Sequence, residues 1–210
     1  MNPKVNALII TDLQNDFMPW GALPVVGGDG IIPVILKICP LFSHIYTTQD
    51  WHPINHVSFA INHGKKPRET IQGHGDIQIL WPVHCVQNTL GAALVPHLQR
   101  ITIEKHFFKG TNSLVDSYST FFDNEKKGST GLGEYLKKHK IKNLFFSGLT
   151  TDYCILYSVL DALKEGFTVF VIQEACKGLN LQPEEDKKAL VQMQDQGAII
   201  LHSKELSKYL

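Results

Sequence analysis

Short runs of apolar residues alternate with longer amphipathic stretches along most of the chain. Several runs are almost continuously apolar, such as ALII at 7–10 and TVFVI at 168–172. Runs of this kind are typical of strands that are buried on both faces of a parallel sheet. The predicted strands lie at 5–11, 45–49, 101–104, 143–147, 168–172 and 198–201.

Between these runs, apolar residues recur at the spacing of an amphipathic helix. The predicted helices lie at about 29–41, 131–138, 152–164 and 183–196. Alternating strands and helices predict an α/β fold, with a doubly wound, mostly parallel six-stranded sheet and helices on both faces. The chain has 210 residues with no repeat or linker, so we expect residues 1–210 to form a single domain.

The charge balance narrows the class of partner. Lys plus Arg and Asp plus Glu both number 20, so the formal net charge is zero and gives no footprint for nucleic acid or an anionic membrane. The apolar stretch at 7–10 is too short for a signal-peptide core, and no window approaches the roughly 18 apolar residues of a membrane span. We therefore expect a cytoplasmic protein whose partner is a small molecule or another copy of itself.

The segment 51–87 fits neither the strand nor the helix pattern. It is rich in His, Gly, Pro and Asn. A loop of this length in a compact domain is usually functional.

Reactive side chains follow the predicted strands. Ligands of an open parallel sheet bind outside the carboxyl ends of its strands. Asp12 comes after the first predicted strand, Asp50 and His52 after the second, Lys109 after the third and Cys154 after the fourth. We expect this acid, metal-binding pair, amine and thiol to meet in one crevice.

Cys154 lies where the fourth predicted strand turns into an amphipathic helix. Thr150, Thr151 or Asp152 could cap that helix, and Cys154 would then sit in its first turn. Free N–H groups and the helix dipole lower a thiol pKa there, and the N–H groups could hold an oxyanion. The ordinary alternative, a buried structural thiol, is assigned to Cys39, Cys85 and Cys176.

Asp12 and Lys109 are candidate partners of this thiol. A carboxylate in a crevice is costly unless it is paired, and Lys109 could pair with Asp12. The thiol of Cys154 would offer Asp12 a proton to accept. The alternatives are an aspartate that caps a turn, which suits Asp16 better than Asp12, and a lysine that is merely solvated.

A metal site is the second candidate. Asp50 and His52 are two residues apart at the end of an extended strand, so their side chains leave on the same side. His84 and His56 are available from the adjoining loop. One Asp with two or three His, and water in the remaining places, suits zinc, iron or manganese. The alternative is a set of surface histidines in a polar loop.

Taken together, these motifs resemble the nicotinamidase branch of the isochorismatase-like cysteine hydrolases. The matching segments are D-L-Q-N-D-F at 12–17, T-Q-D-W-H-P at 48–53 with Asn55-His56 after it, L-W-P-V-H-C at 80–85, Lys109-Gly110 followed by D-S-Y-S-T-F at 116–121, and G-L-T-T-D-Y-C at 148–154. The resemblance runs in order from residue 7 to about 176. One departure is Thr150, where the family commonly has Ala.

The resemblance implies a mechanism. Asp12 would take the proton of Cys154, Lys109 would orient and stabilise the pair, and Cys154 would attack a carboxamide, release ammonia and form a thioester that water resolves. The N–H groups of Thr150 and Cys154 would form the oxyanion hole, with a cis peptide expected between Leu149 and Thr150.

The resemblance also implies a cofactor and a substrate. One divalent metal, zinc before iron or manganese, would be held by Asp50, His52 and His84, with His56 as a further ligand, and would bind the pyridine nitrogen. The substrate ring would be enclosed by Phe17, Trp81 and Tyr118, with Leu23 beside them. The expected reaction converts nicotinamide to nicotinate and ammonia in NAD salvage, with pyrazinamide as a further substrate. The alternatives are hydrolysis of another small amide or carbamate, and a catalytically idle member of the family.

Overall fold

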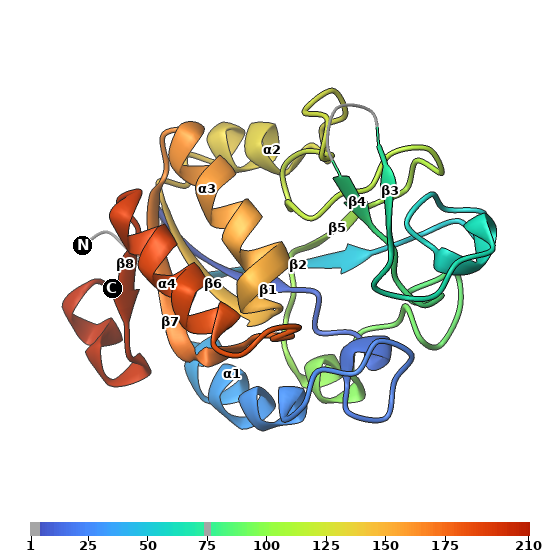
Figure 1. Cartoon of the computed structure of the whole chain (residues 1–210). Coiled ribbons are helices and arrows are strands. Elements are labelled where there is room, and N and C mark those ends of the chain that lie inside the picture. The colour runs from blue at the N-terminus through green and yellow to red at the C-terminus, as the bar shows by residue number, and fades with distance from the viewer. Residues whose placement is uncertain (1–4, 74–76) are drawn as a thin grey trace.

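A six-stranded sheet forms the centre of the computed structural model, which describes residues 5–73 and 77–210. Its strand order is β5-β2-β1-β6-β7-β8, and every neighbouring pair is parallel (Figure 1). The strands are β1 (Asn6–Thr11), β2 (His44–Asp50), β5 (Lys105–Lys109), β6 (Asn143–Leu149), β7 (Thr168–Lys177) and β8 (Ile199–Leu201). The predicted doubly wound parallel sheet is confirmed.

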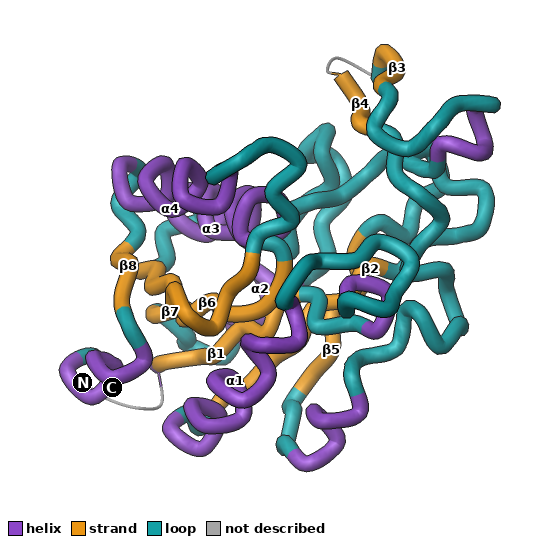
Figure 2. The backbone as a smooth tube through the Cα atoms, turned by 60° about the horizontal axis from the view of Figure 1, so that its bottom comes forward, coloured by secondary structure: helices purple, strands orange, loops and turns teal. Residues whose placement is uncertain are grey.

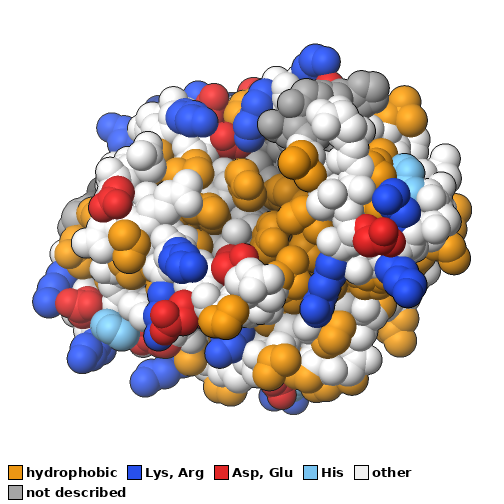
Figure 3. All heavy atoms as spheres, in the orientation of Figure 1, with side chains coloured by type: hydrophobic (Ala, Val, Ile, Leu, Met, Phe, Trp, Pro, Cys, Tyr) orange, Lys and Arg blue, Asp and Glu red, His pale blue; other side chains and the backbone are white. Residues whose placement is uncertain are grey.

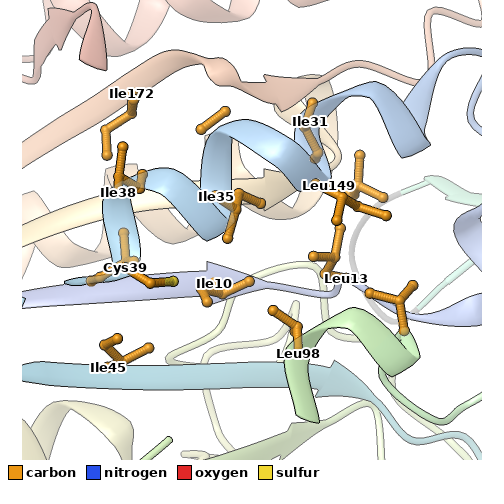
Figure 4. Packing of buried hydrophobic residues seen from close by; sticks show 14 of the residues in the cluster. Ile10, Leu13, Ile31, Ile35, Ile38, Cys39, Ile45, Leu98, Leu149 and Ile172 are labelled. Carbon is orange, nitrogen blue, oxygen red and sulfur yellow. The ribbon is translucent and has the colours of Figure 1, made fainter. Parts of the chain in front are cut away.

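Helices cover both faces of this sheet, as Figures 1 and 2 show. One face carries α1 (Ile32–Ile38), and the other carries α2 (Leu132–Lys138), α3 (Leu156–Lys164) and α4 (Glu185–Asp195). The central strand β1 supplies both cores, because successive side chains point to opposite faces. Leu8 and Ile10 pack on the α1 side, where Figure 4 shows Ile35 facing Ile10, whereas Ala7 and Ile9 pack on the other side.

The third predicted strand was misplaced. Residues 101–104 precede the strand, which is β5, and their Ile101 and Ile103 side chains pack against the core from an irregular segment. The strand itself lies at the sheet edge and pairs only with β2. Its sequence KHFFK is therefore only half apolar, with Phe107 and Lys109 buried, and the search for continuous apolar runs passed over it.

The segment 51–87 contains a small hairpin that the sequence did not predict. Its strands are β3 (Thr70–Gln72) and β4 (Ile77–Ile79), which pair antiparallel. Both strands are short and largely exposed, so they lack the apolar alternation that marks a half-buried strand.

The topology places a crevice at the carboxyl ends of β1 and β6. These strands are neighbours, but the chain proceeds from β1 to β2 and β5 on one side, and from β6 to β7 and β8 on the other. Ligands bind at such a switch point. Within the described ranges, no helix combines the length and apolarity needed to cross a membrane.

Candidate active site

The Lys109 ammonium lies at the centre of the crevice. Lys109 is the last residue of β5 and is only 2% exposed. Its Nζ lies 3.0 Å from Oδ2 of Asp12 and 3.5 Å from Sγ of Cys154, and it donates to the carbonyl of Ser117 at 3.0 Å. It also forms an ion pair with Asp50. The structure thus brings the predicted acid, amine and thiol into direct contact.

Burial sets the electrostatics of this group. Asp12 is completely buried, and its Oδ1 accepts a hydrogen bond from the Thr48 hydroxyl at 2.8 Å. Burial raises the pKa of Asp12, although Lys109 acts against the rise. Burial alone would lower the pKa of Lys109, but Asp12 and Asp50 outweigh it and hold that pKa well above its ordinary value. The lysine therefore stays charged between two carboxyl groups.

Glycine at position 148 allows β6 to approach β1 where their side chains enter the site. Gly148 has φ of 111°, and a Cβ there would lie 2.0 Å from the carbonyl oxygen of Thr11. Only glycine tolerates both conditions. Asp12 follows β1 directly and Cys154 lies in the turn that follows β6, so the close approach of the two strands brings these side chains together.

The turn that carries Cys154 differs from the predicted capped helix. The Leu149–Thr150 peptide is cis, as expected, and a π-helical turn at Thr151–Ile155 precedes α3. The predicted capping hydrogen bond was wrong: Thr150 makes none, and the Asp152 carboxylate instead accepts the N–H groups of Leu179 and Asn180.

The prediction of a lowered thiol pKa was also wrong. Burial raises the pKa of Cys154 well above its ordinary value, and the carboxylates of Asp12 and Asp50 add to the rise, with only Lys109 opposing them. Loss of solvent is the largest cause of this rise. Cys154 therefore carries its proton at rest and needs an acceptor, and the ligand atoms of Asp12, Asp50 and Cys154 lie within 4.8 Å of one another.

The candidate metal ligands lie beside the group formed by Asp12, Lys109 and Cys154. Asp50, the last residue of β2, places Oδ2 3.6 Å from Nε2 of His52 and 3.8 Å from Nε2 of His84. The other ring nitrogen of each histidine pairs with a backbone carbonyl, Nδ1 of His52 with Gly110 at 2.9 Å and Nδ1 of His84 with Pro82 at 2.8 Å. Such partners orient imidazole ligands and leave Nε2 free for a metal. The donor set therefore fits a divalent cation.

The charge states of Asp50 and His84 suit the same purpose. Burial, helped by His52, lowers the pKa of His84 to about 4, so its ring is neutral near pH 7. Burial opposes ionisation of Asp50, but Lys109 and His52 outweigh it and hold the pKa of Asp50 below its usual range. A carboxylate and a neutral imidazole are the forms in which these groups bind metals. Burial opposes protonation of His52, but Asp50 outweighs it and raises the pKa of His52, so a bound cation would displace that proton.

His56 takes a different position from the other predicted ligands. It belongs with His52 and Asp116 in a second group of closely spaced ligand atoms, rather than with Asp50 and His84. Its Nδ1 lies 2.7 Å from the hydroxyl of Ser58.

A small pocket opens above the thiol and encloses about 370 Å³ of empty space. It is lined by Phe17, Leu23, Asp50, His52, Trp81, His84, Asp116, Ser117, Tyr118, Thr150, Tyr153, Cys154 and Leu179. All four residues expected to surround a substrate are among them. Figure 3 shows hydrophobic side chains gathered in a hollow near the middle of the face in view.

Sequence reasoning missed several residues that shape the site. Tyr153 and Leu179 line the pocket, and the Ser117 carbonyl accepts from Lys109. Gln14 holds Asp50 in place: its side-chain amide donates to the Asp50 carbonyl and accepts the Asp50 N–H, both at 2.8 Å. Tyr153 and Gln14 lie inside the motifs at 148–154 and 12–17, so those motifs could have pointed to them. No motif contains Leu179.

Comparisons with known proteins agree with this geometry. The family described as isochorismatase domain matches residues 6–205. The nicotinamidase of Escherichia coli (strain K12) is 44% identical over 198 residues, which is 92% of this chain and 93% of that protein. A solved nicotinamidase/pyrazinamidase of Acinetobacter baumanii has a TM-score of 0.92 at 40% identity and covers 98% of this chain and 100% of its own. The structure of a Pyrococcus horikoshii pyrazinamidase in complex with zinc has a TM-score of 0.76 at 36% identity and covers 94% of this chain and 99% of its own.

Proposed function

This chain belongs to the isochorismatase domain family, and from that membership we propose that it hydrolyses nicotinamide to nicotinate and ammonia in NAD salvage. Curated relatives of this activity share 44% and 46% of their residues with it over most of its length. The observation that carries the proposal is the contact of Lys109 with both Asp12 and Cys154 at the floor of an aromatic pocket. A buried thiol beside a buried carboxylate is an arrangement for nucleophilic catalysis.

The first half of the reaction forms a thioester. Asp12 takes the thiol proton as Sγ of Cys154 attacks the carboxamide carbon, and the C=O π electrons move to the oxygen. The N–H groups of Thr150 and Cys154 hold that oxyanion. As the C–N bond breaks, Asp12 returns its proton to the leaving nitrogen and ammonia departs.

The second half regenerates the thiol. Asp12 removes a proton from a water that attacks the thioester carbon, the C–S bond breaks, and the sulfur leaves as thiolate. That thiolate takes the proton back from Asp12, and the carboxylic acid that has formed releases its remaining proton to solvent and leaves as the carboxylate. Throughout, the ammonium of Lys109 stabilises negative charge as it moves between Asp12 and Cys154.

The neighbouring residues position the substrate ring. We place one divalent ion at Asp50, His52 and His84, with zinc preferred over iron or manganese. When bound, this ion supplies a Lewis acid that can accept the lone pair of a pyridine nitrogen. Phe17, Trp81 and Tyr118, with Leu23, offer apolar and aromatic walls to a flat heterocycle. Pyrazinamide presents the same carboxamide and a ring nitrogen, so it is expected to be a substrate too. The four cysteines are unpaired, which suits a reducing compartment such as the cytoplasm.

Ammonia release from nicotinamide and pyrazinamide and pyruvate release from isochorismate, with metal analysis of the same sample, test the proposal. We expect turnover of both amides, none of isochorismate, and loss of activity on chelation. Absence of nicotinamide turnover in a metal-loaded sample would contradict it. A metal-free preparation that hydrolyses another amide and ignores chelators would support the alternative of a different small-amide hydrolase.

A further inference from the structure

His56 is buried in a way that the proposed reaction does not explain. The residue is 0% exposed, and its Nε2 forms no hydrogen bond of ordinary geometry among the described residues, although the backbone of Val115 lies close to the ring. Its Nδ1 lies 2.7 Å from the hydroxyl of Ser58. With the ring proton on Nδ1 and donated to that hydroxyl, the lone pair of Nε2 is left for another group. Buried polar nitrogens are normally satisfied, so an unpaired one indicates a missing partner.

Asp116, close to His56, lacks a positively charged partner among the described residues. It is 4% exposed, and its oxygens accept only neutral donors, the Ser117 N–H at 2.8 Å and the Gln78 side-chain amide at 2.9 Å. In the described part of the chain, no lysine, arginine or histidine nitrogen forms an ion pair with it, whereas Asp12 and Asp50 both pair with Lys109. A buried carboxylate without a cation is costly.

His52 lies close to both His56 and Asp116. His52, His56 and Asp116 each offer a ligand atom, and the three atoms lie within 4.8 Å of one another. The ring centroids of His52 and His56 are 4.1 Å apart. His52 also belongs to the group with Asp50 and His84, so the two groups share one imidazole. A cation at the second group would satisfy His56 and neutralise Asp116.

A cavity of about 690 Å³ that is open to solvent reaches Asp116, one member of this second group. Polar residues (Gln72, Gln78 and Asn124) and apolar ones (Val57, Ile71, Ile77, Leu114 and Val115) both line it. Asp116 also lines the substrate pocket, so this residue borders both spaces. Oxygen donors suit a hydrated divalent ion, whereas the aromatic walls of the substrate pocket do not.

We propose that His52, His56 and Asp116 form a loading position for a divalent cation, from which the ion passes to Asp50, His52 and His84. His52 is common to the two ligand sets, and the cavity beside Asp116 supplies the route from solvent. The inference rests on the metal centre proposed above, but its measurement needs no substrate and so separates its failure from that of the amidase activity.

The test is the rate of zinc exchange in the full-length protein. Zinc release from the loaded protein is followed with a saturating chromophoric chelator, and reloading of the stripped protein is followed after adding zinc. The variants are His56→Phe, which keeps an aromatic ring but removes both nitrogens, and Asp116→Asn, which removes the charge but keeps the hydrogen-bonding shape. His63→Phe, the same change at an exposed histidine of the same segment, is the control.

We expect both variants to release and reload zinc at least tenfold more slowly than the wild type and the control, with one zinc per chain still bound at equilibrium. Unchanged rates in both variants would overturn the proposal. So would wild-type rates combined with a loss of bound zinc, since His56 would then be a ligand of the final site. A wild-type protein that holds no zinc would overturn it as well. Thermal unfolding checks each variant, and if His56→Phe does not fold, Asp116→Asn decides.

Discussion

The two halves of the site are held in place by different means. The strand-end cluster, Asp12, Lys109 and Cys154, is positioned by the sheet, in which Asp50 pairs with Lys109 and Thr11 pairs with Gly148. The histidine cluster, which consists of His52, His56 and His84, stands on irregular backbone. Each of its rings is oriented by a hydrogen bond from Nδ1 to a nearby group.

The difference separates chemistry and stability from metal binding. The strand-end cluster is a buried arrangement of charges joined to the core, so changes there affect both the reaction and the fold. The histidine cluster can lose a ring with little cost to the sheet, so changes there should act mainly on the ion. Asp50 belongs to both halves, because one oxygen pairs with Lys109 and the other faces the histidines.

The largest expected effect is the loss of the nucleophile. Cys154→Ala should reduce ammonia release from nicotinamide by more than about 10⁴-fold, because no other group can form the thioester. The fold should survive, which thermal unfolding checks. Cys39→Ala is the control, since Cys39 is equally buried, with burial raising its pKa to about 11, but lies in the core beside α1. Turnover retained by Cys154→Ala would refute the mechanism.

Replacing the central cation tests whether the strand-end cluster also supports the fold. Lys109→Met should lower the free energy of unfolding by about 3–5 kcal/mol, because two buried carboxylates lose their counter-charge. The pKa of Lys109 is raised, so its contribution is fully present below its ordinary pKa and is lost only as pH rises through the higher folded value. The deficit measured in urea should therefore be constant from about pH 7 to 9.

A lysine on the same strand provides the comparison. Lys105 is exposed and lies over the rings of Phe107 and Tyr135. Lys105→Met should cost less than about 1 kcal/mol, the range of a solvent-exposed cation–π contact. Equal costs at the two positions would show that burial of the charge has no special importance.

A change in the histidine cluster should show the opposite balance. His84→Ala should weaken zinc affinity by at least about 10- to 100-fold, the loss seen when even the outer partners of a ligand are removed. Titration of the stripped protein with zinc measures it, with the exposed His97→Ala as control. A large drop in the stability of the metal-free chain would contradict the separation of the two halves.

The smallest expected effect concerns a residue that joins the nucleophile to its surroundings. The Ser158 hydroxyl donates to the Cys154 carbonyl and accepts the Thr120 N–H at 2.8 Å, which ties the π-helical turn to the segment that carries Ser117. Ser158→Ala should lower stability by about 1–2 kcal/mol and kcat by about threefold to tenfold, with little change in KM. A rise in KM alone would assign Ser158 to substrate binding. Replacing the exposed Ser129 by Ala should change neither the stability nor kcat.

The parts of the fold that the sequence predicted are those with a local signal. β1 lies within one residue of its predicted bounds because it is buried throughout and its central residues are all apolar. β7 was expected to end at residue 172, yet it continues to Lys177 through polar residues, because Cys176 still pairs with Gly148 beyond an irregularity in the register. Pairing of this kind depends on a distant strand, so no local pattern could have revealed it.

The candidate site divides in the same way. Its residue types and their places after the strands could be read along the chain, since the rule for parallel sheets needs only strand ends. The direction of the Cys154 pKa could not, because the local argument from a helix terminus is outweighed by burial and by two carboxylates from other strands. The partition of the histidines into two groups that share His52 was equally hidden.

Most of the central strands and helices, the reactive side chains and the resemblance to a family could be recognised along the chain, because periodicity and motif spacing act over a few residues. Which charges face Lys109, which carboxylate lacks a cation and which imidazole nitrogen has no ordinary hydrogen bond became visible only in the folded molecule. These properties depend on distances through space and on exclusion of water, and both are set by segments that meet only when the sheet has formed.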